Sequence, residues 1–304
     1  MKNFMAAVIG ICLLNPVFAQ KPDRASLAIL KQKEDSLKPY SWKMITGINT
    51  SDRFVADSSF TRGFVRALTT RNSFYYPFDS LQTVSKIYAP DSSFRIFTWQ
   101  LMVNENLFRQ HGAIQMRTED GSLKLFPLID RSDNTENVSD TISDNLGWIG
   151  AIYYKLIEKK SGNLTYYTLL GFDENNIRST KKVVDVLSFE NGKPRFGAKI
   201  FNIPNNKPVP DAPARYFMEF KKDANPRMVY DPELDMIVME HLVSESNEPN
   251  KKWTLIPDGD YEGLQWKNGR WVYVEKLFSQ VTPEGKAPVP APMNESKIVV
   301  PPGY

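Results

Sequence analysis

The pattern of apolar and polar positions is clearest over residues 148–203, where β-prone runs alternate with short polar breaks. Two of these breaks, Ser161-Gly162-Asn163 and Asn191-Gly192, each separate two such runs. The paired runs are 149–158 with 164–172, and 182–189 with 194–203. An Asn-Gly step between β-prone runs is typical of a type I′ turn, because both central residues of that turn need positive φ. The pattern predicts two consecutive β-hairpins, around which we expect the rest of the fold to be built.

Both faces of the first hairpin are apolar if Ser161-Gly162 forms a two-residue loop. Successive side chains of a strand point to opposite sides, so that every second residue shares a face. The residues of one face are then Tyr153, Ile157, Tyr166 and Leu170, and those of the other are Ile152, Tyr154, Leu156, Tyr167 and Leu169. Because a strand with one solvated face alternates apolar with polar residues, we expect this hairpin to be covered on both sides, or to bind a ligand with one face.

The second hairpin carries a charged residue on an apolar face. Centred on Asn191-Gly192, it places Val183, Asp185, Leu187 and Phe189 opposite Ile200, Ala198, Phe196 and Pro194. If this face is buried, burial raises the pKa of Asp185 and makes it a candidate catalytic group. Alternatively, Asp185 pairs with a Lys or Arg residue or reaches solvent at a sheet edge.

Residues 20–72 have a helical rather than a β pattern. The sequence predicts an exposed helix over 24–37, which Pro39 would help to end, and a second helix over 51–68. Three apolar residues of the second helix are spaced four apart and therefore lie on one stripe: Phe60, Phe64 and Leu68.

Short β-prone runs bounded by Pro, Asp, Gly or Asn continue through residues 73–282. Outside the two hairpins they cover 84–89, 94–103, 113–117, 123–129, 215–221, 227–230, 236–243, 253–256, 261–266 and 271–277. Strands at this spacing, without long helices between them, indicate antiparallel meander sheets. The sequence predicts a mainly β fold with N-terminal helices, arranged like a barrel or a sandwich, with an irregular propeller as the alternative.

Two stretches interrupt or end this β-rich domain. Residues 130–145 are polar and rich in turn-forming residues, and we expect an exposed loop that marks an internal boundary. Residues 283–304 contain repeated prolines, which lack a backbone donor and cannot continue a sheet. We expect them to form an extended or disordered tail.

Residues 1–19 have the pattern of a secretory signal peptide. Lys2 supplies the positive charge, residues 4–14 the apolar core, and Val17-Phe18-Ala19 the cleavage pattern. Cleavage would remove Cys12, the single cysteine, and leave a mature chain without disulfides. No later run approaches the roughly eighteen apolar residues of a membrane-spanning helix. We therefore expect an exported protein, periplasmic or extracellular, with no transmembrane segment in the mature chain.

Composition and charge narrow the class of protein further. The chain has 304 residues, of which 41% are hydrophobic, and can bury a core as one large or two ordinary domains. Its 38 Lys and Arg residues nearly balance its 35 Asp and Glu residues, and no Lys/Arg run is longer than two. This balance argues against nucleic-acid binding and against a polybasic membrane patch.

Five blocks of turn and core residues are similar to those of a known family. They are 87–99 (IYAPDSSFRIFTW), 167–172 (YTLLGF), 182–196 (KVVDVLSFENGKPRF), 236–242 (MIVMEHL) and 256–271 (IPDGDYEGLQWKNGRW). In these blocks, spread over 75–277, the chain resembles uncharacterised exported proteins of Bacteroidota-type bacteria. The resemblance implies an envelope or extracellular location and a β-rich fold, and it implies no activity.

One acidic segment partly matches a calcium-binding loop. Asp258, Asp260 and Glu262 occupy the first, third and fifth positions of an EF-hand pattern, with Gly263 at the sixth. The twelfth position is Gly269, where the pattern requires Glu. We therefore expect a turn that enters a strand, and no metal site.

The aromatic residues of the last predicted hairpin have two interpretations. Trp266 and Trp271 flank a turn at Asn268-Gly269 and would lie directly opposite one another. Such a pair can form a sugar-stacking platform, but more often it stabilises the hairpin, by about 0.2–1 kcal/mol. We favour the structural interpretation. For His241, between apolar residues at two-residue spacing, we likewise expect a hydrogen-bonded core residue rather than a ligand.

The sequence lacks Gly-x-Ser-x-Gly, His-Glu-x-x-His and the P-loop motif. Ser-x-x-Lys occurs at 179–182, but both Ser-Asp-Asn triplets precede it and Lys-Thr-Gly is missing, so penicillin-binding chemistry is not supported. Our leading hypothesis is a non-enzymatic binding or structural module, without cofactor or metal, whose partner is an envelope glycan or protein. The alternative is a carboxylate-based hydrolase that acts on an envelope glycan. Its candidate residues are Asp185 and Glu240 for catalysis and, more weakly, Asp258, Asp260, Glu262, Trp266 and Trp271 for binding. Geometry separates the two, since the two carboxyl groups of a glycosidase lie about 5–9.5 Å apart in a cleft.

Overall fold

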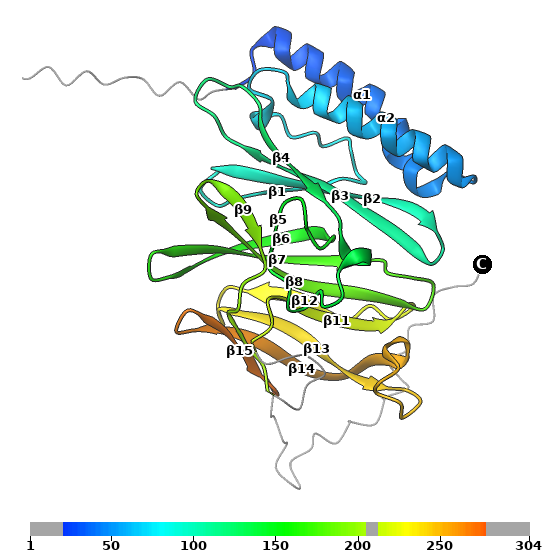
Figure 1. Ribbon diagram of the computed structural model, residues 1–304, viewed down its shortest axis with the longest axis vertical. Helices are drawn as coiled ribbons and strands as arrows, with labels where there is room; N and C mark the ends of the chain where they lie inside the picture. Colours follow the sequence, from blue (N-terminus) through cyan, green and yellow to red (C-terminus); the bar gives the residue numbers. More distant parts are fainter. Residues whose placement is uncertain (1–20, 205–211, 278–304) are drawn as a thin grey trace, which may run out of the picture.

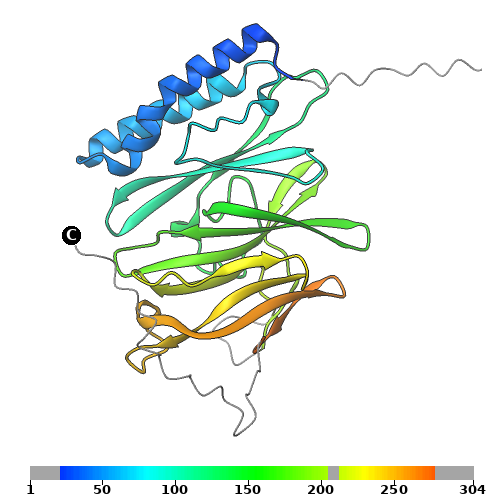
Figure 2. The ribbon, with the colours of Figure 1, turned by 180° about the vertical axis from the view of Figure 1, so that it is seen from behind.

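The computed structural model describes residues 21–204 and 212–277. Within them the chain is mainly β, with antiparallel sheets and two N-terminal helices, as predicted. Four layers are stacked in the order helical hairpin, first sheet, central sheet and third sheet (Figures 1 and 2). No sheet in this part of the chain closes into a barrel, and the arrangement is sandwich-like. The predicted signal peptide at 1–19 and the tail at 283–304 lie outside the described residues.

The elements follow one another along the chain with short connections. The helices are α1 (Arg24–Thr46) and α2 (Thr50–Leu68), and short 3-10 turns lie at Ser73–Tyr75, Ser132–Asn134 and Lys252–Thr254. The strands are β1 (Ser85–Tyr88), β2 (Phe94–Asn104), β3 (Leu107–Met116), β4 (Lys124–Ile129), β5 (Ser143–Asp144), β6 (Ile152–Ser161), β7 (Leu164–Asp173), β8 (Ser179–Glu190), β9 (Lys193–Phe196), β10 (Phe201–Asn202), β11 (Tyr216–Lys221), β12 (Met228–Asp231), β13 (Met236–Ser244), β14 (Leu255–Lys267) and β15 (Arg270–Val274).

Each sheet is built mainly from neighbours in the sequence. The first sheet has the strand order β1-β2-β3-β4, and the central sheet has the order β5-β9-β8-β7-β6, with β11 also paired to β8. The third sheet has the order β10-β15-β14-β13-β12, in which only the β10–β15 pair is parallel. The segment 130–145, predicted as an internal boundary, leads from the first sheet to the central one. Residues on both sides of it, such as Ile96 and Leu169, nevertheless share one core.

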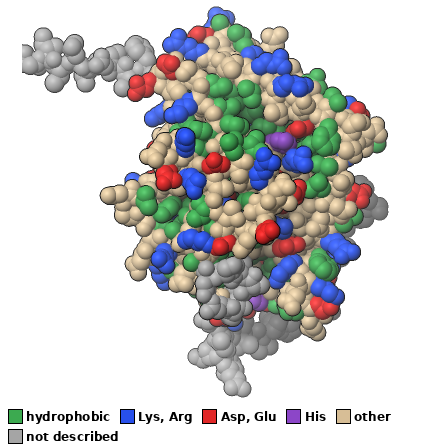
Figure 3. Space-filling view, in the orientation of Figure 1, with side chains coloured by type: hydrophobic (Ala, Val, Ile, Leu, Met, Phe, Trp, Pro, Cys, Tyr) green, Lys and Arg blue, Asp and Glu red, His purple; other side chains and the backbone are tan. Residues whose placement is uncertain are grey.

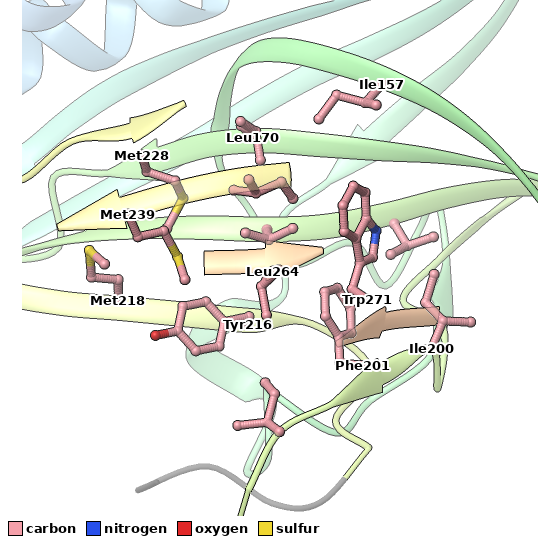
Figure 4. Packing of buried hydrophobic residues seen from close by; sticks show 14 of the residues in the cluster. Ile157, Leu170, Ile200, Phe201, Tyr216, Met218, Met228, Met239, Leu264 and Trp271 are labelled. Carbon is pink, nitrogen blue, oxygen red and sulfur yellow. The ribbon is translucent and has the colours of Figure 1, made fainter. Parts of the chain in front are cut away.

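Three apolar cores lie between the four layers. The first joins the helices to β2 and includes the predicted stripe of Phe60, Phe64 and Leu68. The second lies between the first and central sheets, around Phe94 and Leu187. The third lies between the central and third sheets, and its residues include those labelled in Figure 4: Ile157, Leu170, Ile200, Phe201, Tyr216, Met218, Met228, Met239, Leu264 and Trp271. The central sheet is therefore buried on both faces, as the two apolar faces of its first hairpin predicted.

Helix α1 is longer than predicted, because it continues through Pro39 to Thr46. A proline inside a helix removes one backbone donor, so the carbonyl of Asp35 loses its partner. Pro39 lies on the exposed face of α1, where water can take the place of that donor. Leu37 and Met44, on either side of it, are both buried against the rest of the protein. In the described part of the chain, neither helix is long and apolar enough to cross a membrane.

The first predicted hairpin forms with its loop one residue later, at Gly162-Asn163, and with Ser161 paired to Leu164. The predicted pairing shifts by two residues, which leaves most side chains on the predicted faces. A β-bulge between Tyr153 and Lys155 is the exception. It places Tyr153 in the core with Leu169, whereas a regular alternation assigns it to the face of Leu170. A bulge reverses the alternation of the residues beyond it, and the apolar pattern alone did not reveal it.

The second hairpin has the predicted turn, with φ of 51° at Asn191 and 73° at Gly192. The pairs Leu187–Phe196 and Phe189–Pro194 form as predicted. The pairing of Val183 with Ile200 was wrong, as was that of Asp185 with Ala198. Strand β9 ends at Phe196, and β11 takes over the same edge of β8, so that Val183 pairs with Phe217. The run 194–203 is accordingly divided between β9 and β10.

The last strands also differ from the predicted bounds. The predicted runs 253–256 and 261–266 belong mainly to one long strand, β14. The acidic segment around Asp258 had suggested a break, but it lies within this strand. Its register with β13 shifts between Glu240 and Leu242, which accommodates the irregularity. Trp266 and Trp271 pair directly across the Asn268-Gly269 turn, as predicted.

Candidate functional site

Asp185 lies in the core between the first and central sheets, with a side chain that is 1% exposed. Its Oδ1 lies 3.1 Å from Nε of Arg215, and its Oδ2 accepts a hydrogen bond of 2.9 Å from the Tyr153 hydroxyl. Of the alternatives left open by the sequence, the structure shows the ion pair. A carboxylate this enclosed and this fully paired has no path to a substrate.

The Asp185–Arg215 pair connects three parts of the fold. Arg215 also donates to the carbonyls of Val138 and Thr141, which belong to the polar segment between the first and central sheets. The Tyr153 hydroxyl accepts a 2.8 Å hydrogen bond from Trp148 Nε1. Burial, together with the nearby Asp185 carboxylate, raises the pKa of Tyr153. The network therefore fixes the 130–145 segment to the central sheet, which is a structural role.

Glu240, the second candidate acid, lies in β13 of the third sheet. Its carboxylate accepts a 2.6 Å hydrogen bond from the backbone N–H of Arg227. The Asp185 carboxylate lies on the opposite side of the central sheet, among residues of the core with the first sheet. The structure therefore does not bring these two acids together in one cleft.

The acidic segment of β14 is divided among separate contacts. Asp258 accepts a 2.8 Å hydrogen bond from Nδ1 of His241, and Asp260 lies 3.6 Å from Nζ of Lys276. Glu262 is buried and bonded to the hydroxyl of Tyr273. Within residues 21–204 and 212–277, no group of three His, Cys, Asp or Glu side chains is placed to hold a metal ion.

Of the remaining candidates, His241 differs from what the sequence suggested, and the tryptophan pair has the expected structural role. His241 is hydrogen-bonded as expected, but its side chain is 35% exposed, so it is not a core residue. The Trp266 and Trp271 rings pack edge to face, with centroids 5.1 Å apart. Trp271 is fully buried and donates a 2.9 Å hydrogen bond to Thr168. Its ring therefore has no free face on which a sugar could stack.

A groove of about 710 Å³ opens where the connection from β11 to β12 crosses the end of the central sheet. The strands of the central sheet form its floor, and the connection and the first residues of β12 form its wall. Its lining residues are Tyr154, Phe172, Glu174, Thr180, Lys182, Phe220, Lys222, Asp223, Ala224, Asn225, Pro226, Arg227, Met228 and Val229. An aromatic and aliphatic lining with a few charged groups is the usual composition of a ligand site.

Three cationic side chains line the groove, and they differ in whether an acid neutralises them. The Lys222 ammonium is paired with Glu174 at 2.6 Å and lies over the Phe108 ring. The Lys182 ammonium donates to the Pro226 carbonyl at 2.5 Å, and Arg227 is exposed. Among the described residues, no ion pair involves Lys182 or Arg227. Burial lowers the pKa of Lys182, against the opposing field of Glu240.

The aromatic lining depends on the bulge in β6. Because the bulge reverses the alternation, Tyr154 lies on the side of the third sheet and donates a 2.9 Å hydrogen bond to the Met228 carbonyl. Tyr154 remains 39% exposed at the groove. This site was not predicted from the sequence. A signal existed, however, since Thr180 and Lys182 are polar at positions that share a face with buried Val184 and Val186.

A second depression, of about 580 Å³, lies at the hairpin tips of the central sheet. Tyr166, Tyr167 and Phe189 line it together with two cations. Both cations are paired with acids, Arg195 with Glu190 and Lys199 with Asp140. The groove at Lys182 therefore offers the better site for a ligand that carries charge.

Comparison with known proteins adds no relative to this geometry. No protein-family model matches the chain, and the searches of curated proteins and of solved structures likewise gave no match. A function is therefore inferred from the groove and the residues around it.

Proposed function

We propose that the chain is an exported, non-enzymatic binding module whose groove takes an acidic glycan of the cell envelope. The observation that carries this proposal is the Lys182 ammonium, which is half-buried at the groove and belongs to none of the ion pairs formed by the described residues. A carboxylate is its natural partner, because charge-assisted hydrogen bonds are the stronger ones and gain strength where water is partly excluded.

The shape and lining of the groove favour a ligand with rings. Tyr154 and Phe172 offer aromatic surface beside Lys182, and the exposed Arg227 provides a second cation at the same groove. A sugar acid combines an apolar ring face with a carboxylate and so matches both features. Export is supported by the signal-peptide pattern of residues 1–19. The surroundings of Asp185 and Glu240 favour binding over glycan hydrolysis.

Oligomers of galacturonic acid and their methyl esters test the proposal, because esterification removes the charge and keeps the ring. We expect the acid oligomer to bind in titration calorimetry, with an affinity that falls as salt increases. Lys182→Met keeps the aliphatic stem and should weaken binding about tenfold, since one charge-assisted contact is lost. Lys193→Met, at an exposed hairpin tip, is the matched control and should leave the affinity unchanged.

Three outcomes contradict the proposal. Equal affinity for the acid and the ester would show that the ligand carboxylate is not recognised. Unchanged binding by Lys182→Met would place the ligand elsewhere. Cleavage of the oligomer on prolonged incubation would favour the hydrolase. Export is tested separately by N-terminal sequencing of protein from the cell envelope, for which we expect Gln20 as the first residue. A protein that still begins with Met1 would refute it.

A further inference from the structure

A second site lies on the opposite half of the molecule, where α2 crosses the first sheet. Three residues directly opposite one another form a row across three strands: Trp99 of β2, His111 of β3 and Ile129 of β4. Trp99 is 3% exposed and Ile129 is 40% exposed, so the row runs from beneath the helices to the open edge of the sheet. Figure 3, which views this side, shows hydrophobic side chains gathered at the surface below the helices.

Unpaired polar atoms gather at the buried end of this row. Seven buried side-chain polar atoms of the described residues have no hydrogen-bond partner, and four of them belong to this site. They are Asp57 Oδ1 and Thr61 Oγ1 from α2, Trp99 Nε1 and His111 Nε2. Buried polar atoms without a partner are rare in folded proteins, because each loses its hydration without compensation. Four in one place, on three different elements, indicate a site that a ligand completes.

The geometry shows which groups are available. Asp57 Oδ1 lies 3.4 Å from His111 Nε2, but the two atoms are not aligned for a hydrogen bond. The Trp99 indole N–H interacts with the Asp57 carboxylate, without the geometry of a full hydrogen bond, and this interaction opposes the rise in the Asp57 pKa. The indole ring stacks on the His111 ring, with centroids 5.9 Å apart and planes 16° from parallel. Thr61 follows Asp57 by one helical turn and so lies on the same face of α2.

A charged ligand group does not suit the site. Burial of a ligand charge here would cost hydration free energy without a matched counter-ion, and the positive charge of Arg109, which is near both Asp57 and His111, further disfavours a cation. Burial raises the pKa of Asp57 and lowers that of His111, so the surroundings disfavour the charged form of each. A hydroxyl group fits, because it can accept a hydrogen bond from Trp99 Nε1 and donate one to Asp57 or His111.

The rest of the row is apolar. Ile129 and, one row further along the sheet, Pro127 are exposed on the same face as His111. They offer contact area to an apolar body that extends from the hydroxyl group toward the sheet edge. We propose that this junction binds a small neutral molecule that carries a hydroxyl group on an apolar body. The site is separate from the groove at Lys182 and does not depend on the function proposed there.

The matched probes para-cresol and toluene test this proposal, since they differ by the hydroxyl group. The readout is the ¹H–¹⁵N resonance of the Trp99 indole, identified by its loss in Trp99→Phe. We expect para-cresol to shift this resonance in a saturable way, with an affinity about tenfold higher than that of toluene. Thr61→Val and Asp57→Asn should each weaken para-cresol binding about fivefold or more. Thr69→Val, at the exposed C-terminal end of α2, is the control and should have no effect.

Several results would overturn the proposal. Equal affinity for the two probes would show a purely apolar patch, and unchanged binding in both Thr61→Val and Asp57→Asn would place the hydroxyl elsewhere. If neither probe shifts the indole resonance while its N–H exchanges rapidly with solvent, the four polar atoms are hydrated and bind no ligand. Thermal unfolding of each variant, followed by circular dichroism, shows that a loss of binding is not a loss of folding.

Discussion

The Asp185–Arg215 ion pair is the most enclosed charged contact among the described residues, with side chains that are 1% and 0% exposed. Removal of one partner leaves the other charge buried and uncompensated, which typically destabilises a protein by about 3–5 kcal/mol. We expect Arg215→Met to lower the free energy of unfolding by about this amount, measured by urea denaturation.

The double variant provides the control for this prediction. Asp185→Asn with Arg215→Met leaves no charge unpaired, so its loss should be smaller than the sum of the two single losses. An additive result would show that the two side chains stabilise the fold independently. The pair would then not account for how segment 130–145 is fixed to the central sheet.

For Asp57, in contrast, we expect removal of the charge to stabilise the fold at neutral pH. Burial raises its pKa, so the folded chain binds this proton more tightly than the unfolded chain does. Its contribution to stability is therefore favourable at low pH and decreases as pH rises through the folded pKa. We expect Asp57→Asn to raise the free energy of unfolding at pH 7 and to raise it less at pH 4. Equal changes at both pH values would contradict this account.

Single residues were predictable where the alternation of a strand was regular. Leu187 opposite Phe196 and Trp266 opposite Trp271 follow from a two-residue period and an Asn-Gly turn. Asp185 was recognised as a charge on an apolar face, but Arg215 could not be assigned as its partner, because the switch from β9 to β11 leaves no local signal. Asp57 and His111 were missed for a similar reason, since a helix and a strand bring them together.

At the scale of elements, the turn at Asn191-Gly192 fixes the register of the second hairpin. Gly192 has a φ of 73°, and beyond its two chain neighbours no heavy atom lies within 4 Å of where a Cβ would be. The effect of Gly192→Ala is therefore backbone strain without a clash. We expect the free energy of unfolding to fall by about 1 kcal/mol, from the cost of positive φ for a residue with a Cβ. Lys193→Ala, which leaves this conformation alone, is the control in the same denaturation experiment.

Elements were predicted less well where the local pattern and the tertiary contacts disagree. Pro39 suggested a helix end, yet buried residues on both sides of it hold α1 together beyond that point. The bulge at Tyr154 follows no sequence signature and still decides which tyrosine lines the groove. The groove itself was therefore not predictable. The one sequence signal was Lys182, a charged residue on a strand face that further along carries β-branched apolar residues.

At the scale of the molecule, the class of the fold was predictable and the stacking order was not. Turn residues and the spacing of the strands gave antiparallel sheets, but barrel, sandwich and propeller remained open. The choice depends on which apolar faces meet, and an apolar face does not specify its partner. The two apolar faces of the β6–β7 hairpin came closest to specifying one, because they require a layer on either side.

Adjacent residues of the central sheet lie in different cores, with Leu169 in one and Leu170 in the other. Loss of either core would expose one face of β7, which contributes residues to both. We expect hydrogen exchange of the Leu169 and Leu170 amides to require global unfolding and to be equally slow, whereas the amides at the start of α1 exchange through local fraying. Two well-separated exchange rates for these neighbouring amides would contradict this expectation. A sheet shared in this way makes the two sandwiches a single cooperative unit.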